Sequence, residues 1–200
     1  MESIKNLNQY LDPTDDMKIQ TKPLGEYPWY LRLIFRSQKR KYGKVLQSGL
    51  MWARVPRLFV AVSFLVGTLD RKGSPLEPVL RSLIIVRISQ INWCPYCVDL
   101  NSAVMAERAG SLEKIHALDN WRDSDLYNEK ERVSLEFAEA VTYTDRQVSK
   151  ELMAELKQHF DDDVIVELTG LIAFQNLSTK FNSALDIEAQ GFCRIPDRQA

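Results

Sequence analysis

The chain has few of the residues on which many catalytic sites depend. Its 200 residues include only two histidines and three cysteines, and the 26 basic and 27 acidic side chains nearly cancel, for a net charge of −1. So few histidines and cysteines provide few ligands for zinc, because a zinc site needs several such residues in paired spacings. The near-zero charge gives no overall field that would draw the chain to nucleic acid or to an anionic membrane.

Long apolar runs are also missing. The longest uncharged apolar run, "LFVAVSFLVGTL", covers residues 58–69, short of the roughly 20 residues that a spanning helix needs. We interpret it as a buried helix. The first 20 residues have no apolar core behind a basic end, which argues against a secretory signal. We therefore expect a cytoplasmic protein with neither a membrane nor a nucleic-acid partner, and we read the basic stretch 36–44, "RSQKRKYGK", as a solvated helix end or a subunit contact.

The 45% hydrophobic composition is that of a soluble globular chain. Residues 1–26 are polar and carry Pro13, Pro23 and Gly25, so we predict a polar N-terminal arm followed by one helical domain over 27–200. Beyond Tyr27 apolar residues recur at three and four positions, which predicts two or three helices before Gly73. Six aromatic residues in this part are expected in the core or an interface: Trp29, Tyr30, Phe35, Trp52, Phe59 and Phe64.

The stretch "PLEPVLRSLIIVRISQINWC" could be a strand or a helix. Its β-branched residues suit a buried strand, yet Leu80, Ile84 and Ile88 fall at helical spacing and Pro78 suits a first helical turn. We choose helix, because the neighbouring segments are helical and no second strand-like run exists to pair with it.

The rest of the chain carries helix start and stop signals. Gly110 ends a helix that begins near the cysteines, Asn128 and Glu131 form a capping-box pattern, and Ser149 and the aspartates 161–163 precede two further helices. The sequence therefore predicts an all-α fold.

Two of the three cysteines form the stretch Cys94-Pro95-Tyr96-Cys97. If Cys94 caps a helix and Pro95 takes its first position, both sulfurs lie in the first turn, where free backbone N–H groups favour a thiolate. The spacing also places Cys94, Cys97 and Asn101 on one face. Two inert buried thiols remain an alternative, whereas zinc ligation lacks partners. No metal or organic cofactor is required.

The same four residues occur in glutaredoxins, but the context does not fit a thioredoxin fold. Here 93 residues precede Cys94, and after Pro95 the only proline is Pro196. The fold would need an early strand before the dithiol and a cis-proline loop after it.

The surrounding segment "LIIVRISQINWCPYCVDL" resembles the alkylhydroperoxidase D-like branch of the carboxymuconolactone decarboxylase superfamily. The later stretches "YNEKERVSLEFAEAVT" and "VSKELMAELKQHFDDDVIVELTGLIAFQN" and the terminal "GFC" are similar to its later helices, so the resemblance covers roughly residues 27–193. It implies an all-helical fold with an oligomeric helical core, as a homo-oligomer that is often a trimer or hexamer. It also implies a dithiol that turns over a hydroperoxide or a partner disulfide and is reset by an external dithiol reductant.

The chain departs from that pattern at two positions. The family places a glutamate twelve residues before the first cysteine and a histidine four after the second, as a proton relay, and this chain has Ser82 and Asn101 there. Neither can act as a general base near neutral pH. Ser82 and Ser89 share a helix face that could hold a water near the dithiol, or could be polar fillers.

The remaining reactive side chains are expected to be bystanders. We expect Asp99, Glu107, His116 and His159 at the surface, and Cys193 to be an ordinary terminal cysteine. Which sulfur attacks is open, because helix electrostatics favour Cys94 and the family relay favours Cys97.

The favoured hypothesis is a cytoplasmic thiol-dependent oxidoreductase or peroxidase whose redox pair is Cys94 and Cys97. The alternative is a non-enzymatic oligomeric module in which the pair senses redox state. Lactone decarboxylation is disfavoured, because that branch of the superfamily does not work through a cysteine pair.

Overall fold

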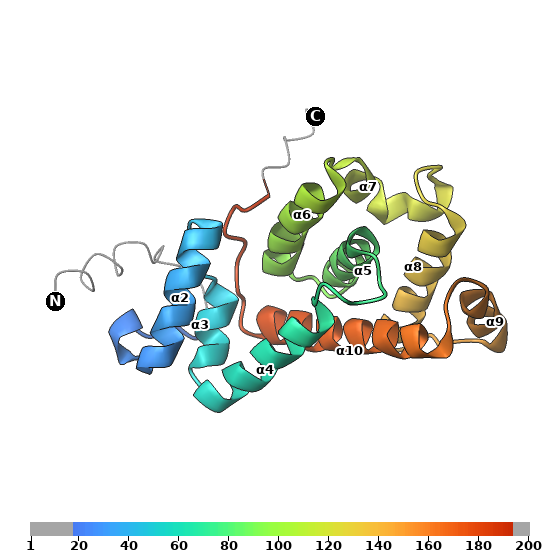
Figure 1. Cartoon of the computed structure of the whole chain (residues 1–200). Coiled ribbons are helices and arrows are strands. Elements are labelled where there is room, and N and C mark those ends of the chain that lie inside the picture. The colour runs from blue at the N-terminus through green and yellow to red at the C-terminus, as the bar shows by residue number, and fades with distance from the viewer. Residues whose placement is uncertain (1–17, 194–200) are drawn as a thin grey trace. The chain divides into compact units, whose positions relative to one another are not determined.

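A computed structural model describes residues 18–193, and every regular element in that part of the chain is a helix (Figure 1). Residues 1–17 of the expected arm lie outside the described residues. The all-α prediction is confirmed. The elements in order are η2 (Leu24–Glu26), α2 (Trp29–Tyr42), α3 (Gln47–Ala53), α4 (Pro56–Leu69), α5 (Pro78–Ile91), α6 (Pro95–Ala109), α7 (Glu113–His116), η3 (Leu118–Asp123), α8 (Glu129–Thr142), α9 (Lys150–His159) and α10 (Asp162–Ala184).

The described chain divides into two compact units. Unit 1 runs to Arg71 and includes Leu185–Glu188, and unit 2 comprises Lys72–Ala184 and the segment from Ala189. In unit 1, Phe35 of α2 makes edge-to-face contacts with Tyr27 and with Phe59 of α4. The Tyr27 hydroxyl donates to the carbonyl of Leu50 at 3.0 Å. Gly43 ends α2 with a positive φ of 74°, a conformation that glycine adopts at little cost.

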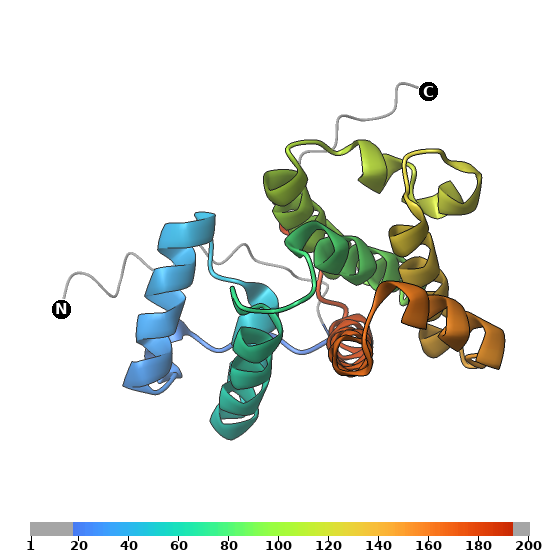
Figure 2. The ribbon, with the colours of Figure 1, turned by 45° about the vertical axis from the view of Figure 1, so that its right-hand side comes forward.

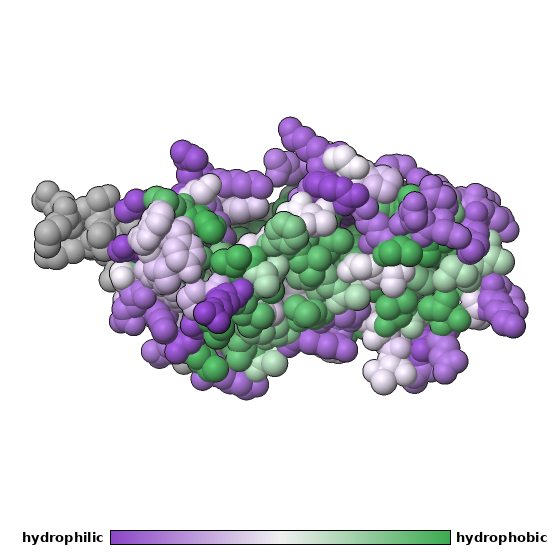
Figure 3. Space-filling model, turned by 60° about the horizontal axis from the view of Figure 1, so that its bottom comes forward, coloured by the Kyte–Doolittle hydropathy of each residue, from purple (hydrophilic) through white to green (hydrophobic). Residues whose placement is uncertain are grey.

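The expectation that residues 58–69 form a buried helix is half wrong. They are helical, as α4, but within this helix only Phe59 and Leu69 are buried, and Phe64 is 78% exposed. Apolar side chains show in green on the face drawn in Figure 3. Six large apolar residues of α4 and its N-cap are exposed, on more than one side of the helix, and are called the α4 surface here: Val55, Leu58, Val60, Phe64, Leu65 and Val66. An apolar run predicts that something covers it, but cannot tell whether the cover comes from the same chain.

The six aromatic residues expected in the core or an interface are likewise only partly buried. Phe35, Trp52 and Phe59 are buried, whereas Trp29 and Tyr30 are exposed. Residues 36–42 of the basic stretch form the last turns of α2 and Gly43 caps its end, as expected of a helix end. None of the helices described here is both long and apolar enough to cross a membrane.

Unit 2 is built around α5, which packs against α6, α8 and α10 (Figures 1 and 2). Its residues Leu83, Ile84, Val86 and Ile88 are fully buried, which explains how a β-branched run can be helical: a helix covered on several sides needs no polar face. The core continues through Met105, Leu118 and Leu135. The helix prediction for this stretch is confirmed.

The predicted helix ends at Gly110, Asn128 and Ser149 are also confirmed within unit 2. Gly110 ends α6 at φ 71°, and Asn128 and Glu131 exchange both hydrogen bonds of a capping box. The Ser149 side chain accepts from the N–H of Leu152 at 3.1 Å. These local signals fix the helix ends that hold the site described next.

Candidate redox site

The dithiol lies where α5 gives way to α6. The chain turns at Trp93, which has a φ of 51°, and the N–H of Cys94 donates to the carbonyl of Ser89 at 3.1 Å. Cys94 is the N-cap of α6 and Pro95 its first residue, as the spacing predicts. Cys94 and Cys97 are joined by a disulfide, with their Cα atoms 5.3 Å apart. Two sulfurs are thus held at bonding distance by the first helical turn.

Both sulfurs are buried and both accept a hydrogen bond. Cys94 is 1% exposed and Cys97 is 3% exposed. The sulfur of Cys94 accepts from the backbone N–H of Cys97 at 3.2 Å, and the sulfur of Cys97 accepts from Nδ2 of Asn182 at 3.1 Å. Both donors are neutral amides. In the reduced protein these donors would favour sulfur in its charged form.

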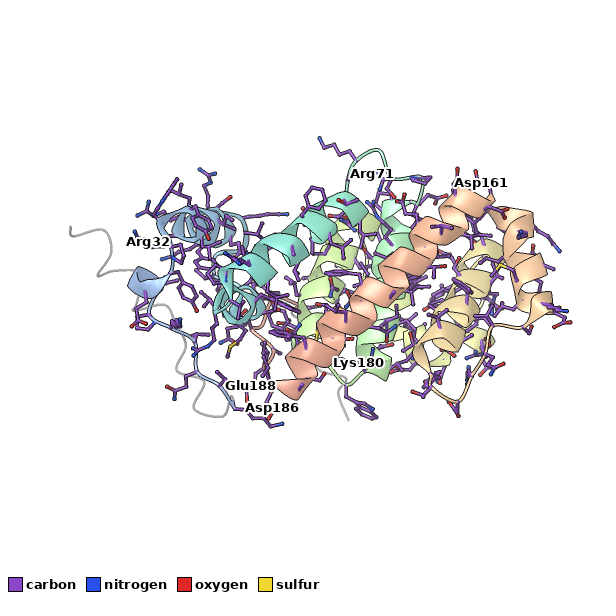
Figure 4. The ribbon with its side chains drawn as sticks, turned by 90° about the horizontal axis from the view of Figure 1, so that it is seen from below. Arg32, Arg71, Asp161, Lys180, Asp186 and Glu188 are labelled. Carbon is purple, nitrogen blue, oxygen red and sulfur yellow. A yellow bond between two sulfur atoms is a disulfide. The ribbon has the colours of Figure 1, made fainter. Side chains whose placement is uncertain are left out.

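Asn182 belongs to a buried polar stripe on α10, made of Gln175, Thr179 and Asn182 at positions i, i+4 and i+7. Gln175 donates to the hydroxyl of Ser89 at 2.9 Å, and Thr179 accepts from Asn92 at 2.9 Å. The stripe therefore joins α10 to the end of α5 and to the dithiol. Figure 4 shows α10 lengthwise from Asp161 past Lys180, a residue on its exposed side.

The sequence reasoning missed this stripe. Its signal is weak, because the three residues recur at helical spacing in a half of the helix that also carries Asn176, Ser178, Lys180 and Ser183. Such a pattern indicates a polar contact but does not identify the partner. Only the packing of α10 on α5 and α6 reveals that one member reaches a cysteine.

The three residues proposed to support the dithiol have other hydrogen-bond partners. Ser82 accepts from Nη1 of Arg108 at 2.9 Å. Asn101 donates to the carbonyl of Cys97 at 2.7 Å, so it contacts the cysteine's backbone rather than its sulfur. Ser89 donates to the carbonyl of Ile85 at 2.6 Å and accepts a hydrogen bond from the side-chain amide of Gln175. Of these side chains, only Asn101 bonds directly to a residue of the pair.

The expectation that Asp99 faces solvent is wrong. Its carboxylate is buried and accepts three backbone N–H groups of the returning C-terminal segment: Gln190 at 2.9 Å, Phe192 at 3.1 Å and Cys193 at 2.7 Å. Charge-assisted bonds of this kind compensate for the burial of the carboxylate. A sequence cannot show that a segment some 90 residues away will return to a given turn of α6.

The third cysteine lies in that same segment. Cys193 is a free, half-buried thiol, and burial, reinforced by the neighbouring Asp99 carboxylate, raises the pKa of the thiol. Glu107 and His116 are exposed, as expected, and His159 is half-buried in the last turn of α9. Among residues 18–193 no three His, Cys, Asp or Glu side chains gather as metal ligands would.

A separate charged cluster surrounds Glu139 of α8, which is 1% exposed. Its carboxylate accepts from Arg87 at 2.7 Å, from Trp121 and Arg122 at 2.9 Å each, and from Arg146 at 3.2 Å. Burial alone would raise the pKa of Glu139, but these donors outweigh it, and the pKa lies below its ordinary value.

A surface pocket beside that cluster carries charges of both signs and contains neither cysteine. Its charged lining residues are Arg122, Glu136, Arg146, Glu151 and Glu155. The buried dithiol therefore remains the better candidate for chemistry.

Comparison with known proteins places these features in context. The model of the carboxymuconolactone decarboxylase family matches residues 53–140, a range that contains both cysteines of the pair. The protein YnjA of Escherichia coli (strain K12) is 47% identical over 178 residues, covering 89% of this chain and 98% of YnjA.

Two solved structures are similar in fold. A peroxidase-related protein of Ralstonia eutropha JMP134 with an alkylhydroperoxidase D core has a TM-score of 0.79 at 23% identity, over 88% of this chain and 94% of that one. At that identity the likeness shows the fold alone. The debrominase Bmp8 has a TM-score of 0.72 at 25% identity, over 82% of this chain and 88% of that one.

Proposed function

Because this chain belongs to the carboxymuconolactone decarboxylase family and has an alkylhydroperoxidase D-like fold, we propose that it is a thiol-dependent peroxidase whose working groups are Cys94 and Cys97. The observation that carries the proposal is the pair itself. Two cysteines share the first turn of α6, close enough to form a disulfide, and each sulfur accepts a hydrogen bond.

The reaction needs only these two sulfurs and an external reductant. One cysteine loses its proton to solvent, and the thiolate attacks a peroxide oxygen. The O–O bond breaks, the sulfur becomes a sulfenic acid, and the departing alkoxide takes a proton to leave as an alcohol. The second thiol then attacks the sulfenic sulfur, which forms the disulfide and releases water. Two electrons pass from the pair to the peroxide, and an external dithiol returns them by exchange.

Burial of the pair favours a small oxidant over a protein disulfide. Thiol–disulfide exchange requires one sulfur to approach another directly, and here the sulfurs are nearly inaccessible. A hydroperoxide needs far less room than a folded partner. The same argument favours a small-molecule or flexible dithiol as the reductant.

The proposed partner at the surface is a second copy of the chain. The α4 surface carries six large exposed apolar residues close together in the chain. Self-association would remove such residues from water. The proposed compartment is the cytoplasm, where reducing conditions would return the pair to the dithiol form.

The test is to measure consumption of hydrogen peroxide and of an organic hydroperoxide with an excess of dithiol. Cys94→Ser and Cys97→Ser should each abolish turnover, whereas Cys193→Ser, the matched control outside the pair, should retain it. One equivalent of peroxide should oxidise one pair. Turnover that is absent in the parent, or that survives in both variants of the pair, contradicts the proposal.

A halogenated substrate belongs in the same assay, because the debrominase Bmp8 shares the fold. Replacement of bromine by hydrogen also consumes two electrons and would leave the pair as a disulfide with release of bromide. Bromide release without peroxide consumption would move the substrate class from hydroperoxides to brominated aromatics.

The alternative is a non-enzymatic redox-sensing module. It is favoured by the absence of a titratable side chain at positions 82 and 101, where serine and asparagine stand. This alternative expects stoichiometric oxidation of the pair without turnover when the external dithiol is present.

A further inference from the structure

The hydrogen bond between Asn182 and Cys97 joins two buried groups from different helices. Asn182 is 1% exposed and lies in the last turns of α10, whereas Cys97 lies in the first turn of α6. The 3.1 Å separation between Nδ2 and Sγ is within the range of hydrogen bonds to sulfur. A carboxamide N–H that points at a sulfur inside the protein replaces the water that would otherwise solvate a thiolate there.

The two sulfurs differ in the origin of their donors. Cys94 accepts from a backbone N–H that is part of the helix start itself, as in any N-cap. Cys97 accepts from a side chain that packing brings in from 85 residues away. The donor to Cys97 can therefore be removed by mutation, and its removal leaves the donor to Cys94 in place.

An amide can contribute to this reaction without titrating. It cannot take the proton from Cys97, so that proton leaves to solvent or buffer, but it stabilises the anion that remains. Hydrogen bonds to charged groups are roughly twice as strong as those between neutral groups. The bond to Asn182 therefore strengthens when Cys97 ionises, and weakens again when the sulfur is neutral or in a disulfide.

We propose that Asn182 is a catalytic residue that holds the thiolate of Cys97, the sulfur that the family relay also favours as the one that attacks the oxidant. This role rests on the proposed function of the dithiol. The same contact acts in the return step: when the reductant attacks the sulfur of Cys94, the bond that breaks releases Cys97 as a thiolate onto the waiting amide. Asn182 thus serves both halves of the cycle.

The first experiment isolates one thiol at a time. The double variant Cys94→Ser with Cys193→Ser retains only Cys97, whose thiolate is followed by its ultraviolet absorbance during a pH titration. Adding Asn182→Ala should lower the fraction of Cys97 present as thiolate about tenfold near neutral pH, because a charge-assisted bond is lost. Asn182→Asp, which keeps the shape and adds a carboxylate, should lower it further.

The matched background retains Cys94 through Cys97→Ser with Cys193→Ser. There Asn182→Ala should change the thiolate fraction by less than about twofold, since Cys94 keeps its backbone donor. A second control replaces Asn120, an exposed asparagine of η3, with alanine in the Cys97 background. If Asn182 had a merely structural role, Asn182→Ala would change the thiolate fraction of neither cysteine, or of both alike. Either result would overturn the proposal.

The second experiment uses the full pair in equilibrium with a reference dithiol. At alkaline pH, where the reduced form carries the thiolate, loss of the donor should favour the disulfide about tenfold, equivalent to a fall of about 30 mV in reduction potential. If Asn182→Ala does not fold, Asn182→Asp decides the matter, and an unchanged thiolate fraction in that variant contradicts the proposal. These readouts need no peroxide, so failure of turnover in the parent counts against the proposed function and not against the role of Asn182 toward Cys97.

Discussion

Arg108 of α6 donates a hydrogen bond to Ser82 of α5, with Nη1 2.9 Å from Oγ. In the family that the sequence resembles, the residue at the position of Ser82 is the glutamate of a proton relay. In this chain the position carries a serine hydroxyl, which accepts from the guanidinium of Arg108. The side chain does not form a relay to the dithiol, and a positive charge lies beside it instead.

Restoring the relay residues should therefore fail unless Arg108 is also changed. In Ser82→Glu with Asn101→His, the new carboxylate should pair with Arg108, which keeps it ionised and unable to shuttle a proton. We expect less than about threefold change in peroxide turnover. Adding Arg108→Met frees the carboxylate and should raise turnover at least tenfold.

The measurement is steady-state peroxide consumption for the parent, the double variant and the triple variant. Arg108→Met by itself is the matched control, and it supplies no base. If the double variant already matches the triple, Arg108 does not restrain position 82.

Removing the charge of Asp99 should make the thiol of Cys193 more reactive. The Asp99 carboxylate raises the pKa of this thiol and holds its backbone N–H. Asp99→Asn should lower that pKa and loosen the segment, so that alkylation of Cys193 at neutral pH becomes severalfold faster. Mass spectrometry after timed alkylation measures the rate. Glu107→Gln, an exposed carboxyl on the same helix, should leave the rate unchanged.

Acid should destabilise the fold through Glu139. The pKa of this carboxyl lies below its ordinary value in the folded protein, so its stabilising contribution is present above the unfolded-state pKa and is lost as the pH falls through the folded-state pKa. Denaturant unfolding should show the free energy of unfolding declining below about pH 4.3.

Two variants test that assignment. Glu139→Ala should cost about 3 kcal/mol at neutral pH, because the largely buried Arg87 side chain and the buried N–H of Trp121 lose the carboxylate that accepts from them. Glu139→Gln should flatten the decline in acid. Glu155→Gln, at an exposed position, is the control and should leave both the stability and its pH dependence within about 0.5 kcal/mol of the parent.

A charge at the α4 surface should dissociate an assembly of copies. Phe64 is the most exposed of the six apolar residues of this surface, and Phe64→Glu would place a charge where a dry contact is proposed. Light scattering should show a shift toward the monomer, whereas Asn120→Glu on η3, with the same change in charge, should leave the mass unchanged. A monomeric parent would remove the assembly from the proposal.

The helices could be predicted because their signals are local. Pro78, Gly110 and the pair Asn128 and Glu131 act within one turn of the backbone, so their conformational effects do not depend on the remainder of the chain. The dithiol was equally local, because a separation of three residues at a helix start suffices to bring two cysteines together.

Burial was harder to predict. The apolar run of α4 was expected in the core, yet most of it is exposed, whereas Asp99 was expected in solvent and is buried. Both errors arise because hydropathy describes the side chain alone. Whether a residue is covered depends on which segments pack over it.

By itself the sequence determined the helical class and the position of the cysteine pair, since both follow from interactions between neighbours in the chain. Only the tertiary structure decided what surrounds the pair. The partners of Ser82 and Cys97 are Arg108, 26 residues away, and Asn182, 85 residues away. Side-chain hydrogen bonds over such separations exist only after the helices have packed, because packing is what fixes distance and excludes water.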